Sequence, residues 1–339
     1  MATRKIKRPA HLRGRWLYRL HSFLICVWSF FFVTALRRLR GPQLPGWDWK
    51  MEFCTVCLRR HMNIVHNMKA VAEARAYLRS MILPRPGKSE VLIETVDTPV
   101  KGCWYIPPES PNQGCILYLH GGGYAYHPAM HDSLAAKLAQ AAALRTFALD
   151  YRLTPEYPFP AQLEDAQAAY RWLLDSGVNP QRLVIVGDST GGNLALALLI
   201  SLRDAKQPMP ALAVCLSPWT DVSNSGDSLA QNQPYDWLPK VAVEQWATWL
   251  CNGKEASHPL LSPLNADLHG LPPIIIQAGE AEIFFDMIRS FTEVARRQGA
   301  RVTLEIWEHM NHDFQIFGDD VSQSQAAITH LGQIIQQYT

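Results

Sequence analysis

Short apolar runs alternate with longer amphipathic stretches through most of this chain. The apolar runs predict β-strands at 91–96, 101–106, 115–120, 146–150, 183–187, 211–216, 273–278 and 301–307. Stretches with helical periodicity lie between them and predict helices at 131–144, 161–175, 191–204, 284–298 and 322–338. Strands that alternate with helices are typical of a mostly parallel sheet with helices on both faces. The pattern therefore predicts an α/β protein.

The first apolar stretch, residues 23–36, differs from the predicted strands. It is continuously apolar over 14 residues, whereas a helix needs about 20 to cross a bilayer. Extension back to Trp16 gives 21 residues but includes Arg19 and His21. Residues 16–36 therefore have three interpretations: an uncleaved signal anchor, a helix lying in the membrane interface, or a buried helix. The first two predict membrane association within a basic N-terminal segment, 1–45.

Basic residues flank this stretch unequally. Seven Lys and Arg residues precede the apolar core and three follow it. The positive-inside rule then favours a cytoplasmic N-terminus and a lumenal body, as in a single-pass protein of the endoplasmic reticulum. However, the chain contains no Asn-x-Ser/Thr glycosylation site, which a lumenal domain often carries. The side of the membrane therefore stays open.

Charge excludes one class of function for the rest of the chain. The 339 residues carry a formal net charge of +2, but ten of the 32 Lys and Arg residues lie within positions 1–40. Residues 41–339 hold the other 22, together with all 30 acidic residues, so this part is mildly acidic. A nucleic-acid-binding domain would need a basic surface. We therefore expect no nucleic-acid partner.

The spacing of the cysteines predicts neither a metal site nor a set of disulfide bonds. The seven cysteines are scattered, and Cys54-x-x-Cys57 is not followed by a second pair at zinc spacing. No thioredoxin-like unit surrounds that pair. His127 and His131 also suggest metal ligands, but no third ligand is evident near them in the sequence. The cysteines are interpreted as small core residues, and no metal is expected.

Two glycine-rich turns carry the candidate chemistry. Gly187-Asp188-Ser189-Thr190-Gly191-Gly192 follows one predicted strand and opens a predicted helix. Such a strand–turn–helix exposes a serine as a nucleophile. His120-Gly121-Gly122-Gly123 follows another strand, and its glycines expose backbone N–H groups. Together with the N–H of Thr190, they would form a cradle for an oxyanion. The two turns thus predict acyl-transfer chemistry at Ser189.

The chain resembles the hormone-sensitive-lipase family of α/β-hydrolases, which includes microbial carboxylesterases and arylacetamide deacetylase-like enzymes. The resemblance covers roughly residues 85–320. Besides the two glycine turns it rests on these motifs: Asp150-Tyr151-Arg152-Leu153, Pro155-Glu156, Phe159-Pro160-Ala161, Asp165, Ser217-Pro218-Trp219, Ser262-Pro263-Leu264 and Leu271-Pro272-Pro273. It implies an eight-stranded α/β-hydrolase sheet with a helical cap, and no metal or organic cofactor.

The resemblance also implies a catalytic acid and base. The family places an aspartate where Glu282 stands and a second one at Asp286, so Glu282 is the expected acid, longer by one methylene. Asp286, otherwise a helix cap, and Glu280 remain alternatives. The family's His-x-Phe pattern matches His312, with His309 as the other local histidine, expected on the rim. The order Ser189, Glu282, His312 is that of α/β-hydrolases.

Two segments interrupt the strand–helix rhythm and predict a cap. A helical-looking stretch at 50–82 precedes the first strand and is broken by Pro84, Pro86 and Gly87. The Trp- and Pro-rich stretch 219–262 contains one short helical piece at 239–251. We expect both to cover the site. The expected division is a cap segment at 46–84 and a catalytic domain at 85–339, with the cap insertion at 219–262.

Further residues are expected to support the site. Asp188 would buttress the nucleophile turn, and Asp150 would pair with Arg152 near the cleft. The aromatic side chains expected to line an apolar pocket are Tyr124, Tyr126, Trp219, Tyr235 and Trp237.

The sequence therefore predicts a serine esterase that hydrolyses a lipophilic ester, or transfers its acyl group. A role in secondary metabolism is an expectation from the resemblance alone. Two alternatives use the same fold. One is a ligand receptor, as in plant hormone receptors that keep the serine but lose the histidine; here His312 is present. The other is an amidase or lactonase, which would use the same machinery in a different pocket.

Overall fold

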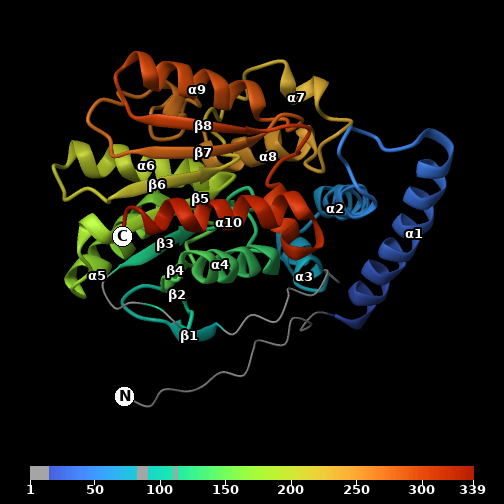
Figure 1. Ribbon diagram of the computed structural model, residues 1–339, viewed down its shortest axis with the longest axis horizontal. Helices are drawn as coiled ribbons and strands as arrows, with labels where there is room; N and C mark the ends of the chain where they lie inside the picture. The colour runs from blue at the N-terminus through green and yellow to red at the C-terminus, as the bar shows by residue number, and fades with distance from the viewer. Residues whose placement is uncertain (1–14, 82–90, 109, 111–113) are drawn as a thin grey trace.

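One eight-stranded sheet forms the centre of the molecule (Figure 1). The computed structural model describes residues 15–81, 91–108, 110 and 114–339. The strands are β1 (Leu92–Val96), β2 (Gly102–Ile106), β3 (Cys115–Leu119), β4 (Thr146–Leu149), β5 (Leu183–Asp188), β6 (Leu212–Leu216), β7 (Ile274–Gly279) and β8 (Val302–Trp307). Their order is β1-β2-β4-β3-β5-β6-β7-β8. Only β2 runs antiparallel to its neighbours, β1 and β4. The predicted α/β-hydrolase architecture is confirmed, with strand ends within one residue of those expected.

Helices cover both faces of the sheet because the inner strands are apolar on both sides. Every residue of β3, β5 and β6 is buried. Alternate side chains form two separate cores, with Ile116 in one and Leu117 in the other. The first core includes α4 (Ala129–Ala142) and α10 (Ser322–Gln336). The second includes α5 (Ala161–Asp175), α6 (Thr190–Asp204) and α9 (Phe285–Arg297). Short 3-10 helices occur at η1 (Pro180–Arg182), η2 (Pro263–Asn265) and η3 (Phe314–Asp320), and the last is kinked at Gly318.

The two segments that broke the sequence pattern both form helices outside the sheet. The first contains two helices rather than one, α2 (Trp49–His66) and α3 (Val71–Leu78), with a turn between them. The second contains α7 (Ser228–Gln231) and α8 (Lys240–Cys251). The expected break at Pro84, Pro86 and Gly87 lies outside the described residues, as does the basic stretch 1–14. The proposed domain boundaries stay a prediction.

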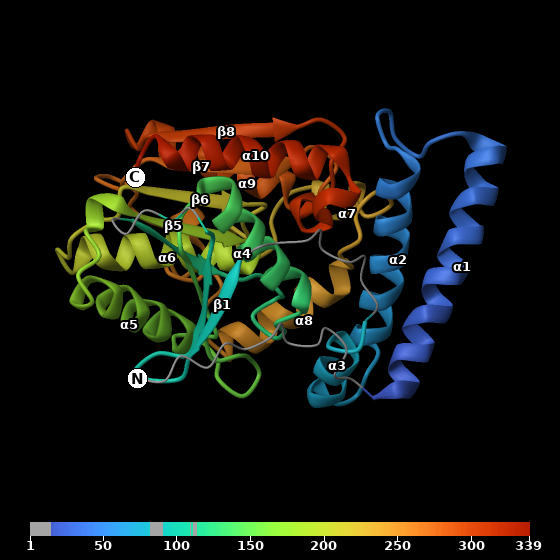
Figure 2. The ribbon, with the colours of Figure 1, turned by 60° about the horizontal axis from the view of Figure 1, so that its bottom comes forward.

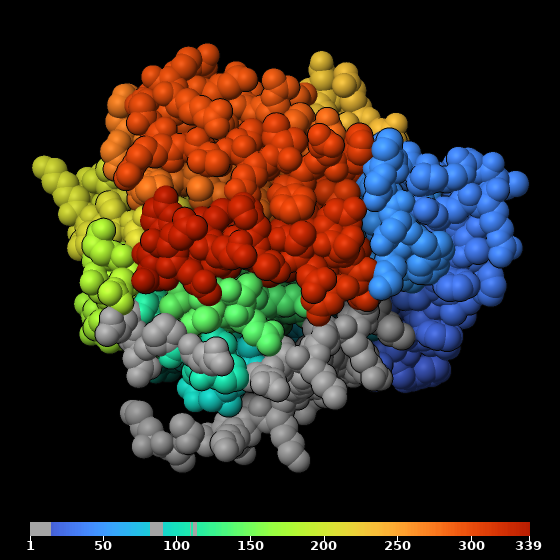
Figure 3. All heavy atoms as spheres, in the orientation of Figure 1, coloured from blue at the N-terminus to red at the C-terminus, as the bar shows by residue number. Residues whose placement is uncertain are grey.

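The N-terminal apolar stretch forms α1 (Trp16–Arg40), which lies beside α2 (Figure 2). The two helices form a block on one flank of the molecule (Figure 3). Glu52 of α2 is fully buried and accepts hydrogen bonds from Arg37 at 2.8 Å and Arg40 at 2.5 Å. The indole N–H of Trp49 donates to the Thr34 hydroxyl at 3.1 Å. Polar contacts therefore hold α1 on α2.

The two faces of α1 differ in an unusual way. Small residues such as Ser22 and Ser29 are buried toward the protein. The large apolar side chains that remain exposed are Trp16, Leu17, Leu20, Phe23, Leu24, Val27, Trp28, Phe30, Phe31, Phe32 and Leu39. Among the described helices, α1 alone is long and apolar enough to cross a membrane by length and composition, a property that signal sequences share. A fully buried helix is not what the structure shows.

Candidate active site

Ser189 lies at the sharp turn between β5 and α6. Its backbone has φ 53° and ψ −116°, a sparsely populated conformation for a residue with a side chain. The turn is held by the Ser189 N–H, which donates to the Leu216 carbonyl at 2.8 Å. Gly191 permits the close approach behind it, because a Cβ there would lie 1.9 Å from the Leu119 carbonyl oxygen. The strand–turn–helix thus places a strained, 4% exposed serine at the carboxyl end of β5.

The triple-glycine loop after β3 lies beside Ser189. Gly122 and Gly123 have positive φ values of 108° and 67°, and both line the same pocket as Ser189. Within the described residues, no backbone hydrogen bond uses the N–H groups of Gly122, Gly123 or Thr190. Thr190 also begins α6, whose N-terminus contributes positive potential. Unused N–H donors are what a developing oxyanion requires.

The first two residues of this loop have other partners. The Gly121 N–H donates to Asp188 Oδ2 at 3.0 Å. The His120 ring is fully buried, stacks on Tyr151 and lies 2.6 Å from the Gly121 carbonyl through Nδ1. Tyr151 in turn donates its hydroxyl to the His120 carbonyl at 2.6 Å. These contacts fix the shape of the loop and leave the later glycines as its free donors.

Asp188 ties the two glycine turns together. Besides Gly121, its carboxylate accepts a short hydrogen bond from the Tyr118 hydroxyl. His131 Nδ1 lies 2.8 Å from Oδ2, although its alignment is not that of a hydrogen bond. Burial raises the pKa of Asp188, but His131 and the Tyr118 hydroxyl outweigh burial and hold that pKa below its ordinary value. The expected buttressing contact is therefore present.

His312 is in direct contact with the nucleophile. Its Nε2 lies 2.9 Å from Ser189 Oγ, and the residue is fully buried. Phe284 packs edge-on against the ring, and the indole N–H of Trp237 donates to the His312 carbonyl at 2.6 Å. Burial lowers the pKa of His312 to about 3, so the ring is neutral at pH 7. A neutral imidazole in this position can accept the serine proton.

Glu282 lies in the loop after β7 and is also fully buried. Its Oε2 accepts hydrogen bonds from the Ser217 hydroxyl at 2.5 Å and from the Gly279 N–H at 3.1 Å. Ser217 Oγ in turn accepts from the Asp313 N–H at 3.0 Å, which links Glu282 to the histidine loop. Burial raises the pKa of Glu282 well above its ordinary value, against the opposing effect of Ser217.

Several buried polar atoms in the loops after β7 and β8 lack hydrogen-bond partners, and two of them belong to Glu282 and His312. Within the described structure, neither Glu282 Oε1 nor His312 Nδ1 makes a hydrogen bond. One is a carboxyl oxygen and the other a ring nitrogen, so they are complementary in type. Orphaned buried polar atoms cost free energy and commonly mark functional sites.

The competing carboxylates and the second histidine have contacts elsewhere. Asp286 accepts a hydrogen bond from the Ser228 N–H of α7 at 2.8 Å, and so does not cap its own helix as expected. Glu280 is exposed and accepts from the His309 N–H at 3.1 Å. His309 is itself partly exposed and its carbonyl accepts from Trp47 at 2.7 Å. The structure brings none of the three into contact with Ser189.

The expected pair between Asp150 and Arg152 is wrong. Asp150 pairs with Lys101 at 2.5 Å, whereas Arg152 binds Asp165 at 2.8 Å. The backbone N–H of each residue already bonds to the residue that its side chain contacts, Asp150 to the Lys101 carbonyl and Arg152 to the Asp165 carboxylate. His131 contacts Asp188 as described. His127 instead stacks on His120 and lies 3.6 Å from Asp150, which supplies a third group that the sequence did not reveal.

An apolar pocket of about 20 Å³ opens onto Ser189. Of the aromatic residues expected there, Tyr126 and Trp237 line it, whereas Tyr124, Trp219 and Tyr235 do not. Tyr235 packs against a separate cluster that includes Trp47 and Phe314. The sequence reasoning missed the walls supplied by Leu58, Met62, Leu78, Leu238 and Trp246. They come from α2, α3 and the 219–262 excursion, so both expected cap segments do face the site. The helical periodicity of α2 is the signal in the sequence that could have identified its part of these walls.

Comparisons with known proteins identify the family. A family model described as an alpha/beta hydrolase fold matches residues 116–316. An acetyl-hydrolase from Streptomyces hygroscopicus is 40% identical over 69% of this chain and 79% of its own length. An ethyl acetate hydrolase from Pseudomonas putida is 30% identical over 69% of this chain and 77% of its own.

Solved structures give the same result. A mutant of the esterase E40 has a TM-score of 0.81 and 35% identity, covering 88% of this chain and 99% of its own. An esterase from the bacterial hormone-sensitive lipase family has a TM-score of 0.75 and 36% identity, covering 83% and 97%. The chain therefore belongs to the hormone-sensitive-lipase family of α/β-hydrolases, a family of carboxylic ester hydrolases.

Proposed function

We propose that this chain hydrolyses a lipophilic carboxylic ester through a Ser189–His312–Glu282 triad. The observation that carries the proposal is the 2.9 Å contact between His312 Nε2 and Ser189 Oγ beside unused backbone donors. His312 removes the Ser189 proton as Oγ attacks the ester carbonyl, and the N–H groups of Gly122, Gly123 and Thr190 hold the oxyanion. His312 then protonates the leaving alcohol, and water releases the acyl group in a second, equivalent step.

Glu282 has the role of orienting His312 in this proposal. As the ring takes up the serine proton it becomes cationic, and a carboxylate opposite Nδ1 stabilises that charge. Glu282 Oε1 and His312 Nδ1 are both buried and unpaired, so a hydrogen bond between them would satisfy both. His120 and Gly121 shape the oxyanion loop, because His120 Nδ1 and the Gly121 N–H are already engaged.

The pocket supports a substrate with a small acyl group. Its walls are largely apolar side chains, and Trp246 lies so close that a Cβ on Gly123 would fall 2.2 Å from its ring. A volume of about 20 Å³ leaves little room beyond the reacting carbonyl. We therefore infer a short acyl chain with a lipophilic alcohol part. A lactone or amide is less well supported, and the place in secondary metabolism stays a prediction.

The decisive experiment is ester hydrolysis by the full-length chain. We expect turnover of short-chain aryl esters, decreasing as the acyl chain lengthens, and a loss of about 10⁶-fold in kcat for Ser189→Ala. A Ser225→Ala variant is the control, because Ser225 is bonded to Asp221 away from the pocket. A folded protein without Ser189-dependent turnover at any acyl length would support the receptor alternative instead.

Membrane association through α1 is a separate part of the proposal. The names of the similar proteins do not refer to a membrane. This part of the proposal therefore rests on the exposed apolar face of α1 alone. Phe31 is 66% exposed, and Phe31→Glu should weaken binding to lipid vesicles. Ile306→Glu, at a 48% exposed site on β8, should not. Equal binding by both variants and the unchanged chain would contradict the proposal.

A further inference from the structure

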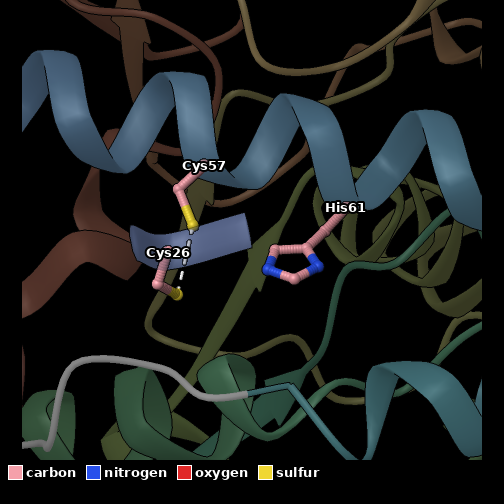
Figure 4. A group of neighbouring side chains, drawn as sticks. All are labelled: Cys26, Cys57 and His61. Carbon is pink, nitrogen blue, oxygen red and sulfur yellow. Dashed lines mark hydrogen bonds between the residues drawn. The ribbon is translucent and has the colours of Figure 1, made fainter. Parts of the chain in front are cut away.

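A group of two thiols and an imidazole lies between α1 and α2, apart from the ester site (Figure 4). Cys57 and His61 project from the same side of α2, one turn apart, and Cys26 comes from α1. The ligand atoms of the three residues all lie within 4.8 Å of one another. The two sulfur atoms are 3.6 Å apart, with a hydrogen bond between them. Two helices thus bring together three side chains that are typical metal ligands.

The histidine of this group is oriented by a second contact. His61 is 1% exposed, and its Nδ1 lies 2.8 Å from the Tyr77 hydroxyl of α3. Metal-binding histidines almost always use their second ring nitrogen in this way, because it fixes the ring orientation. Nε2 lies 3.4 Å from the Ser22 hydroxyl, a long contact, and faces the two thiols. The nitrogen that remains is therefore the one available to a metal ion.

We propose that Cys26, Cys57 and His61 bind a soft divalent metal ion, with Zn²⁺ as the expected occupant. Zinc accepts two cysteines and one histidine as protein ligands, with a water or another group in the fourth position. Each thiol loses its proton to solvent on binding, so two thiolates balance the charge of the ion. Soft sulfur ligands disfavour Mg²⁺ and Ca²⁺. This site is independent of the proposed ester hydrolysis.

The second group of candidate ligands in the described residues does not share these properties. His120, His127 and Asp150 lie equally close together. However, although burial lowers the pKa of His127, Asp132 and Asp150 outweigh it and raise that pKa to about 10. A ring that keeps its proton cannot donate a lone pair from that nitrogen.

The proposed ion would fasten α1 to the cap. Cys57 and His61 face α1, whereas their neighbours Leu58 and Met62 line the pocket at Ser189. Cys54, the other half of the C-x-x-C spacing, is buried but not part of the group. The sequence could not reveal the site, because Cys26 is 31 residues from Cys57 and meets it only when α1 docks.

Titration of the reduced, metal-free, full-length protein with Co²⁺ and Zn²⁺ tests the proposal. We expect one ion per chain, a sulfur-to-cobalt absorption band, and its displacement by Zn²⁺. Cys26→Ser and Cys57→Ser should each weaken binding by at least about 100-fold, and Tyr77→Phe by about 10-fold. The matched control is Cys54→Ser, three residues along the same helix. Ester turnover by each variant reports that it is folded.

Three results would overturn the proposal. The first is a protein that binds no Co²⁺ or Zn²⁺ after reduction. The second is binding that Cys54→Ser weakens as much as Cys57→Ser. The third is a Cys26–Cys57 disulfide that persists in the purified protein and leaves no metal-binding capacity; it appears in a mass spectrum as the loss of two hydrogen atoms. Loss of ester turnover in Ser189→Ala should leave metal binding unchanged, which separates this site from the proposed function.

Discussion

The two halves of the candidate active site are built by different means. The nucleophile half depends on the main chain: the strained turn at Ser189 and the unused N–H groups of Gly122 and Gly123. The acid–base half depends on side chains from the loops after β7 and β8, Glu282 and His312. In the first half the geometry is already in place. In the second, several buried polar atoms have no partner, including Glu282 Oε1 and His312 Nδ1. We therefore expect the acid–base half to be the part that adjusts during turnover.

Replacement of Glu282 tests the adjustable half most strongly. We expect Glu282→Gln to lower kcat by about 10⁴-fold, because an amide cannot stabilise a cationic His312. Asp286→Asn, whose carboxylate bonds to α7, should stay within a few fold of the unchanged enzyme. Steady-state kinetics on a short-chain aryl ester give both values. The reverse ranking would assign the acid to Asp286.

Replacement of Gly123 tests the main-chain half. Gly123→Ala should lower kcat by about 10²–10³-fold, because the added methyl group meets Trp246 and disturbs an oxyanion donor. Gly299→Ala is the matched control: it has a similar positive φ of 78° but open space around it. Full activity in Gly123→Ala, with the control equally active, would remove the loop from the oxyanion site.

The pH profile tests the electrostatic state of His312. Because burial lowers its pKa to about 3 from an ordinary 6.5, the base stays deprotonated as pH falls through 6.5. The acid limb of kcat/KM should therefore lie well below pH 6.5, leaving activity at pH 5 close to that at pH 7. An acid limb centred near 6.5 would mean that the ring is solvated in the free enzyme.

Ser217 connects the two loops of the acid–base half and should have the smallest effect. Ser217→Ala removes the bond to Glu282 at 2.5 Å and the acceptor for the Asp313 N–H. We expect kcat to fall by about 10-fold with KM unchanged, since the pocket walls are untouched. Ser217→Thr, which keeps the hydroxyl, should recover part of the loss. A change in KM alone would indicate a structural role.

The contrast between main-chain and side-chain geometry also explains which parts of the site could be predicted from the sequence. Clustered glycines indicate tight turns of the main chain. The turns around Ser189 and Gly123 could therefore be predicted from the order of residue types in the sequence. The strands could also be predicted, because the inner strands are mostly apolar. By contrast, the Asp150–Arg152 pair and the Asp286 cap depend on side-chain directions at the ends of elements, and both expectations were wrong.

The N-terminal region shows the same limit in another form. Hydropathy identified α1 as a helix but could not say which face it buries. The structure buries Ser22, Ile25, Ser29 and Val33 and leaves most of the large apolar side chains of α1 outside. That arrangement depends on Arg37, Arg40 and Glu52, which no periodicity in α1 alone could indicate.

The buried carboxylate of Glu52 has a practical consequence for anyone who shortens this protein. Removal of the first 45 residues to improve solubility would take away both guanidinium groups and leave an uncompensated negative charge on α2, which costs about 3–5 kcal/mol for a buried ion pair. It would also uncover the helix that carries Leu58 and Met62 into the pocket. Truncation of the N-terminus for expression would therefore alter the pocket at Ser189 as well as the solubility of the protein.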